Sequence, residues 1–78
     1  MKNDIFIMTR GDRVCRIPNR ARPRDESIFV RKDSTCIKLD EQLDTRYPMT
    51  YVLWVDSSTG ETGLGWVLSS RLRSIHLI

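Results

Sequence analysis

The sequence has little of the chemistry that most enzyme and metal sites need. Its 78 residues include one histidine, two cysteines and four glycines. Cys15 and Cys36 have neither a CxxC spacing nor a neighbouring histidine, so neither a zinc site nor a cysteine nucleophile is predicted. His76 lies in a strand-like pattern near the end of the chain, which is typical of a solvent-facing residue. We therefore predict no catalytic residue, no metal and no cofactor.

Long apolar runs are also missing. The apolar stretch at residues 5–8 is too short for a signal peptide or a membrane-spanning helix, so we expect a cytoplasmic protein with no membrane partner. In that compartment we expect Cys15 and Cys36 to be small buried thiols rather than a disulfide. Hydrophobic residues make up 40% of the chain and charged residues 29%, which indicates a compact fold rather than disorder. A single domain over residues 1–78 is expected.

What the sequence does contain is a series of short segments rich in β-branched and aromatic residues. Clusters of Gly, Pro, Asp and Ser separate these segments, and this pattern predicts five to seven short antiparallel strands. A tight turn at Asp33 predicts that the strands on either side of it form a hairpin. Residues 40–48 are polar and have room for one helical turn before Pro48, and residues 69–72 fit a 3₁₀ turn. The predicted strands cover residues 5–9, 13–17, 27–31, 35–39, 50–55, 64–68 and 73–78.

A small core follows from the apolar positions of these strands. Tyr51 and Trp54 are three positions apart, so on a regular strand they face opposite sides, and we expect Tyr51 to be the exposed one. Both tryptophans are assigned to the interior. The predicted core contains Ile5, Ile7, Val14, Ile28, Val30, Ile37, Val52, Trp54, Trp66, Leu68 and Leu72.

Positive charge is concentrated in one part of the chain. Residues 10–24 hold six arginines and one acid, Asp12, whereas residues 25–44 hold six acids and three cations. These segments can neutralise each other, or the arginines can face an acidic partner. Pro18 and Pro23 limit the freedom of the loop between them, which lowers the entropy lost on binding. The arginines are Arg10, Arg13, Arg16, Arg20, Arg22 and Arg24.

The C-terminal third carries a family resemblance. Residues 51–72 (YVLWVDSSTGETGLGWVLSSRL) resemble the distal half of SH3 and bacterial SH3-like domains: an aromatic strand, a glycine-containing turn, a strand with Gly-Trp-Val, a 3₁₀ turn and a closing strand. The resemblance implies a small SH3-like barrel. Gly65, just before Trp66, suggests a β-bulge. Type II dihydrofolate reductases share a Gly-Asp-Arg-Val opening, but their V-Q-I-Y motif is replaced here by LGWV, which excludes that activity.

The comparison with SH3 domains also limits which of their functions can be expected of this chain. Eukaryotic SH3 domains bind proline-rich peptides between aromatic side chains. In this sequence Ser69 and Ser70 stand where that groove has proline and tyrosine, and only Tyr51 falls where its tryptophan is expected. Polyproline recognition is therefore not predicted.

Two binding functions remain open at the level of sequence. The first is a small non-enzymatic regulator or inhibitor that binds an acidic protein surface, and its size is typical of phage- or plasmid-encoded regulators. Its contacts come from Tyr51 and four arginines: Arg16, Arg20, Arg22 and Arg24. The second is an RNA- or DNA-binding barrel that contacts phosphates through all six arginines of residues 10–24. The absence of aromatic residues among these arginines favours the first function, because single-stranded nucleic acids are bound partly by base stacking.

Overall fold

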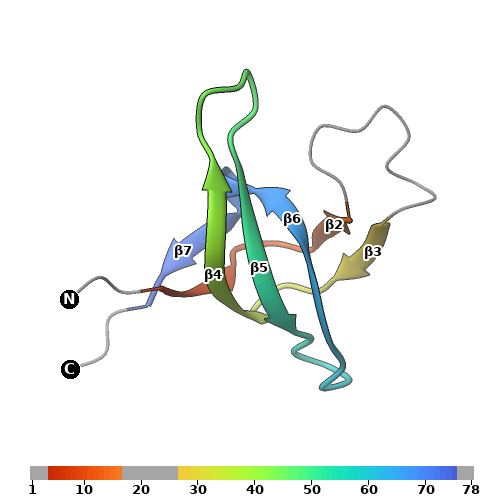
Figure 1. Cartoon of the computed structure of the whole chain (residues 1–78). Coiled ribbons are helices and arrows are strands. Elements are labelled where there is room, and N and C mark those ends of the chain that lie inside the picture. Colours follow the sequence, from red (N-terminus) through yellow and green to blue (C-terminus); the bar gives the residue numbers. More distant parts are fainter. Residues whose placement is uncertain (1–3, 17–26, 76–78) are drawn as a thin grey trace.

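The computed structural model describes residues 4–16 and 27–75, and these residues form seven antiparallel strands and one 3₁₀ turn (Figure 1). The all-β class, the number of strands and the 3₁₀ turn before the last strand are as predicted. The elements are β1 (Ile5–Met8), β2 (Asp12–Cys15), β3 (Ser27–Val30), β4 (Thr35–Gln42), β5 (Met49–Val55), β6 (Thr62–Leu68), η2 (Ser69–Arg71) and β7 (Leu72–Ser74).

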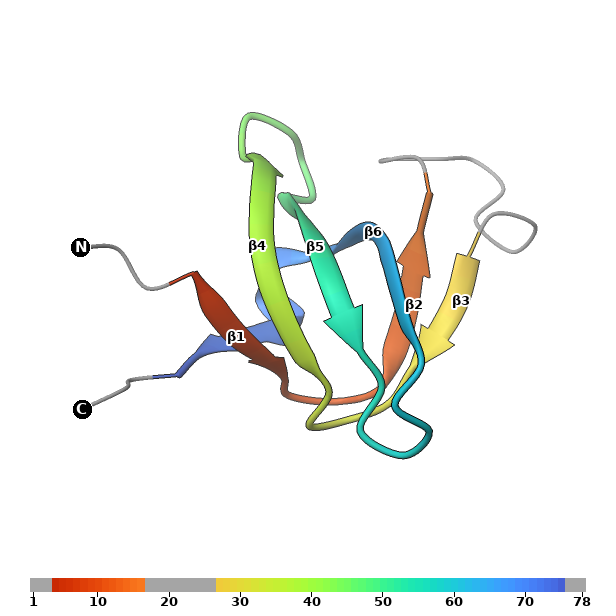
Figure 2. The ribbon, with the colours of Figure 1, turned by 60° about the horizontal axis from the view of Figure 1, so that its bottom comes forward.

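All seven strands belong to one sheet. Their order is β3-β2-β6-β5-β4-β1-β7, and every neighbouring pair is antiparallel. The sheet curls into a half-barrel, as Figures 1 and 2 show from two sides. We call the face turned toward the interior the inner face, and the opposite face the outer face. Because the half-barrel is open, β3 and β7 form the two ends of the sheet.

Two local predictions are wrong, and both concern pairing. The strands on either side of Asp33 do not form a hairpin: β3 pairs with β2, while β4 pairs with β1 and β5. The connection between β3 and β4 instead lies against the end of β1, where the Asp33 N–H donates to the Met8 carbonyl at 2.9 Å. Gly65 also stays in register with Val52, so no bulge occurs there; the irregularity lies in β4, between Lys38 and Asp40.

The strand β4 is longer than predicted. It continues through Gln42, so the helical turn considered for residues 40–48 does not form, and the connection to β5 has no helix. Residues 40–42 stay extended because they pair with Met49–Tyr51 of β5. A long-range partner has therefore decided the conformation of a polar segment whose local sequence was ambiguous.

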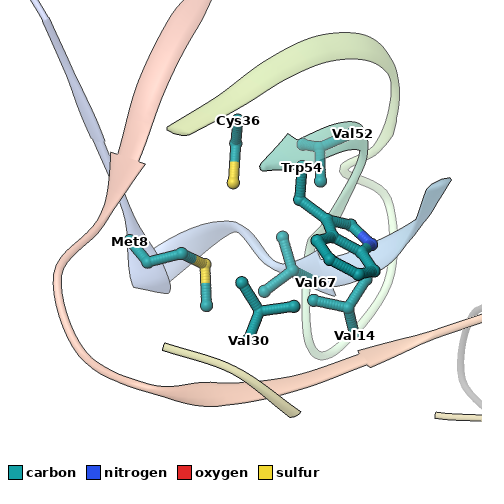
Figure 3. Close-up of a cluster of buried hydrophobic side chains, with 7 residues drawn as sticks. All are labelled: Met8, Val14, Val30, Cys36, Val52, Trp54 and Val67. Atoms are coloured by element: carbon teal, nitrogen blue, oxygen red, sulfur yellow. The ribbon is translucent and has the colours of Figure 1, made fainter. Parts of the chain in front are cut away.

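The core lies on the inner face of the half-barrel (Figure 3). Along β5 the burial alternates, so that Val52 and Trp54 point inward while Tyr51, Leu53 and Val55 point outward. The buried cluster draws one or two side chains from each of six strands. Its members are Met8, Val14, Val30, Cys36, Val52, Trp54 and Val67.

The predicted core is correct for four residues and wrong for others. Four predicted residues are buried: Val14, Val30, Val52 and Trp54. Leu72 is partly buried and packs against the cluster, whereas Ile28 and Ile37 are exposed and Trp66 is only half-buried. Ile37 and Trp66 lie on the outer face. They were predicted to be in the core because their strands have apolar residues on both sides, and the sequence does not reveal which side faces inward. The prediction missed three buried residues, Met8, Met49 and Val67, whereas Cys15 and Cys36 are buried as expected.

Asp56 fixes the loop between β5 and β6. Its carboxylate is buried and accepts hydrogen bonds from the backbone N–H groups of Ser58 (2.8 Å) and Thr59 (3.0 Å). It also accepts one from the backbone N–H of Arg31 (3.3 Å) and lies 3.5 Å from the guanidinium of that residue. These contacts hold the pKa of Asp56 below its usual value. The loop is thereby tied to the connection between β3 and β4.

Both cysteines are buried and free, as predicted. Burial raises the pKa of the Cys36 thiol from 9.0 to about 11. The unfolded chain then releases this proton at a lower pH than the folded chain. Stability should therefore fall by ~2–3 kcal/mol as the pH rises from about 9 to about 11. Urea unfolding of the wild type and of Cys36→Ala over this range measures the effect. If the variant loses as much stability with pH as the wild type, the thiol is not its source.

Candidate binding surface

The outer face carries an aromatic pair. Tyr51 of β5 and Trp66 of β6 lie directly opposite each other, with ring centroids 5.1 Å apart and planes tilted by 44°. Both side chains are half-buried. Tilted aromatic pairs of this kind stabilise each other beyond the area that they bury. The pair is therefore an ordered aromatic surface that remains accessible to solvent.

The strand β2 reaches this aromatic pair at a single point. Its only pairing with β6 joins Cys15 to Trp66, and Gly65 lets the two backbones approach closely there. A Cβ atom on Gly65 would lie 2.4 Å from a methyl carbon of Val14 and 3.0 Å from the Cys15 carbonyl oxygen. Arg16, which follows Cys15 and is exposed, is consequently next in the chain to the residue that pairs with Trp66.

Of the predicted partner-binding residues, the structure describes Tyr51 and Arg16. Tyr51 lies in a cross-strand row with Trp66 and Cys15, and Arg16 follows Cys15 in the chain, one residue outside this row. The other three predicted contacts, Arg20, Arg22 and Arg24, lie outside the described residues, as does His76. After the residues that are not described, the first residue is Ser27, and it pairs with Cys15.

Two further arginines were predicted to contact phosphate in the alternative function. Arg10 and Arg13 are exposed, and neither forms an ion pair with an acidic residue in the described part of the chain. Arg13 donates to the Ser27 hydroxyl at 3.3 Å. Asp12, the one acid among residues 10–24, is paired with Arg71 at 2.8 Å. The acid that would offset these arginines is therefore already engaged elsewhere.

Beside the aromatic pair lies a row of aliphatic side chains that the sequence analysis missed. Ile37, Leu53 and Leu64 face one another across β4, β5 and β6, and Ile5 of β1 pairs with Ile37. Residues directly opposite on antiparallel strands share one face of the sheet. Ile37 is 37% exposed and Leu64 is 53% exposed, so the row is open to solvent. The apolar residues on both faces of β5 and β6 were the signal that could have revealed it.

Acidic residues border the aromatic pair on its other side. Asp40 pairs with Tyr51 across β4 and β5, and Glu41 follows it in an ion pair with Lys38 at 3.0 Å. Tyr47, in the connection between β4 and β5, is 60% exposed. The surface is thus amphipathic: Asp40 lies in the same row as the aromatic pair, and Arg16 follows Cys15, the residue that pairs with Trp66.

Other kinds of site are not found among residues 4–16 and 27–75. No cluster of three or more His, Cys, Asp or Glu side chains could hold a metal ion there. Within the same residues there is no helix long and apolar enough to cross a membrane. Comparisons with protein-family models, with curated proteins and with solved structures find no match to this chain.

Proposed function

We propose that this protein is a non-enzymatic binding module of SH3-like type that holds an acidic protein surface. The observation that carries the proposal is the Tyr51–Trp66 pair on the outer face, in a row with Cys15, the residue before Arg16. Tyrosine, tryptophan and arginine are the residues most often found at the energetic centre of protein interfaces. The strand order and the 3₁₀ turn before β7 support the SH3-like assignment.

The aliphatic row supports a protein partner in particular. Contiguous exposed apolar side chains on a small domain commonly mark an interaction surface. Ile37, Leu53 and Leu64 supply apolar contact next to the aromatic pair, and Arg16 begins the basic segment that supplies charge. An acidic partner segment with apolar side chains matches both features. Such a module fits the role of a regulator or inhibitor of a larger assembly.

A nucleic-acid partner is the alternative, and one observation favours it. The Tyr51–Trp66 pair offers an aromatic platform near arginine, the combination used to bind single strands by stacking and phosphate contact. One feature counts against it. The aliphatic row beside the aromatic pair has no stacking surface for bases.

A peptide selection tests the proposed function. A display library of random peptides is selected on the immobilised wild type, and its binders are compared with oligothymidylate and a mixed-sequence RNA. We expect selected peptides rich in Asp and Glu with apolar neighbours. Their affinity should fall by roughly tenfold or more with Trp66→Ala and with joint replacement of Arg20, Arg22 and Arg24 by alanine.

The control variant is Arg73→Ala, which removes an exposed arginine from β7 at the other end of the sheet and should leave peptide affinity unchanged. Selected peptides without acidic enrichment, or affinities indifferent to Trp66, would refute the proposal. Strongly salt-dependent binding of the oligonucleotides with no peptide binding would establish the alternative.

A further inference from the structure

The outer face continues past the aromatic pair onto β2 and β3, which lie side by side at one end of the sheet (Figure 2). Arg13 of β2 lies directly opposite Phe29 of β3. Val14, the residue after Arg13, points into the buried core, and neighbouring residues of a strand face opposite sides of the sheet. Arg13 and Phe29 are therefore both on the outer face.

Arg13 is also a diagonal neighbour of the aromatic pair. Cys15, two residues after Arg13 and on the same face, pairs with Trp66 of β6. Diagonal neighbours on adjacent antiparallel strands are roughly 7–8 Å apart, a distance that a long side chain can span. The Arg13 guanidinium can therefore reach a group that is bound against Trp66.

Phe29 offers apolar surface in a defined orientation. Its side chain is 51% exposed, and the far end of its ring lies against Gly11. A Cβ atom added at Gly11 would come within 2.5 Å of the ring, so any larger residue at this position would displace it. An aromatic side chain that is already held in place loses little conformational entropy when a partner covers it.

The positive charge of Arg13 is not neutralised by its surroundings. Arg13 is exposed, donates to the Ser27 hydroxyl at 3.3 Å, and forms no ion pair with any residue that the structure describes. Asp12 is the only acid within β2 and β3, and Arg71 binds its carboxylate at 2.8 Å. A guanidinium in this state is suited to a carboxylate, which it can bind through two parallel hydrogen bonds.

We propose that Arg13 and Phe29 form a second contact site for an acidic segment of the partner protein. Arg13 binds a carboxylate of this segment, and Phe29 packs against one of its apolar side chains. The site deepens the proposed function and rests on it, because it lies on the same face as the Tyr51–Trp66 pair. The aliphatic row on the far side of that pair favours a peptide over a nucleic acid, since it gives apolar contact without stacking.

The strand geometry sets the order of the contacts along the bound segment. Phe29 is two strands away from Trp66 across the sheet and two residues away along it. With about 4.8 Å between strands and about 3.4 Å per residue, the separation is roughly 12 Å, which an extended peptide covers in about four residues. Arg13 lies between the two aromatic residues. We therefore expect two apolar residues about four positions apart, with Asp or Glu between them.

A charge reversal on both sides of the contact tests the site by isothermal titration calorimetry. The probe is the tightest-binding acidic peptide from the display library. Arg13→Glu should weaken its binding by about tenfold or more, and replacing the central acid of the peptide by lysine should restore binding to this variant but not to the wild type. A failure of the lysine peptide to recover affinity for Arg13→Glu would overturn the proposed contact.

Three further variants test the aromatic half of the site. Phe29→Ala removes the apolar contact and should weaken peptide binding by about fivefold or more. Gly11→Ala keeps every contact group but displaces the Phe29 ring, and should weaken binding in the same direction. Arg73→Ala, at the opposite end of the sheet, should leave the affinity unchanged.

The second site and the proposed function fail in different ways. If Trp66→Ala weakens peptide binding while Arg13→Glu and Phe29→Ala do not, the proposed function stands and the second site is refuted. If no acidic peptide is selected, both are refuted. Oligonucleotide binding that requires Arg13, with peptide binding that does not, would also refute the site, because its occupant would be a nucleic acid. Circular dichroism shows whether each variant is folded, and the charge reversal at Arg13 decides the question if Phe29→Ala is not.

Discussion

Trp54→Ala is expected to lower the free energy of unfolding by about 3–5 kcal/mol. Trp54 is 4% exposed and belongs to the buried cluster, so the change leaves a large cavity on the inner face. A domain of this size has a total stability of only about 4–12 kcal/mol. The variant should therefore lose a large share of the stability of the domain, which urea unfolding followed by circular dichroism would show as a much lower midpoint.

Trp66→Ala is the matched control, since it removes the same side chain from the outer face. Trp66 is half-buried against Tyr51, and its loss should cost about 1–2 kcal/mol and leave the chain folded. This difference is also what makes Trp66→Ala usable in binding experiments. Equal loss of stability in the two variants would contradict the assignment of the two tryptophans to opposite faces.

Gly65→Ala should have the second largest effect on stability, although it adds only one methyl group. The new Cβ atom would lie 2.4 Å from a methyl carbon of Val14 and 3.0 Å from the Cys15 carbonyl oxygen. The backbone oxygen cannot rotate away, so β2 must move from β6 at their only pairing. We expect a loss of about 2–3 kcal/mol.

Leu64→Ala provides the control for this change, because it alters the neighbouring residue, which is 53% exposed. Its cost should stay below about 1 kcal/mol, and the comparison uses the same urea unfolding measurement. If Gly65→Ala is no more destabilising than Leu64→Ala, the close approach of β2 and β6 is not what requires glycine at this position.

Much of the secondary structure could be predicted from the sequence, because it depends on local patterns. The β-branched and aromatic residues at 50–55 indicated a strand with Val52 and Trp54 in the core, and the turn formers after it indicated the loop that begins at Asp56. The opposite orientation of Tyr51 and Trp54 followed from the two-residue period of a strand. Each of these features is fixed by residues a few positions apart.

The strand pairings could not be predicted in the same way. A turn at Asp33 was predicted to be the centre of a hairpin, yet the strand after it, β4, pairs with β1, and Asp33 donates to Met8, about 25 residues earlier in the chain. The sides of β4 and β6 were equally ambiguous, because apolar residues occur on both. Ile37 and Trp66 were therefore placed in the core, and the outer apolar surface went unrecognised.

For the candidate site, too, the individual residues could be predicted better than their arrangement in space. Tyr51 and Arg16 were each identified from sequence, but for separate reasons and as parts of separate surfaces. The row that joins Tyr51 to Cys15, the residue before Arg16, depends on the contact between β2 and β6 at Gly65, which no local pattern encodes. Trp66, which completes the aromatic pair, was assigned to the interior. The residues of the site were thus largely visible in the sequence, whereas their arrangement was not.

The proposed binding surface can be tested most directly through the indole N–H resonances of the two tryptophans. The indole nitrogen of Trp54 is buried in the core without a hydrogen-bond partner in the described part of the chain, whereas Trp66 lies beside Tyr51 on the outer face. A selected acidic peptide is titrated into ¹⁵N-labelled protein, with Trp66→Phe used to assign the signals. We predict that the Trp66 indole resonance shifts to saturation while that of Trp54 stays in place. A bound peptide that leaves the Trp66 resonance unmoved would contradict the account.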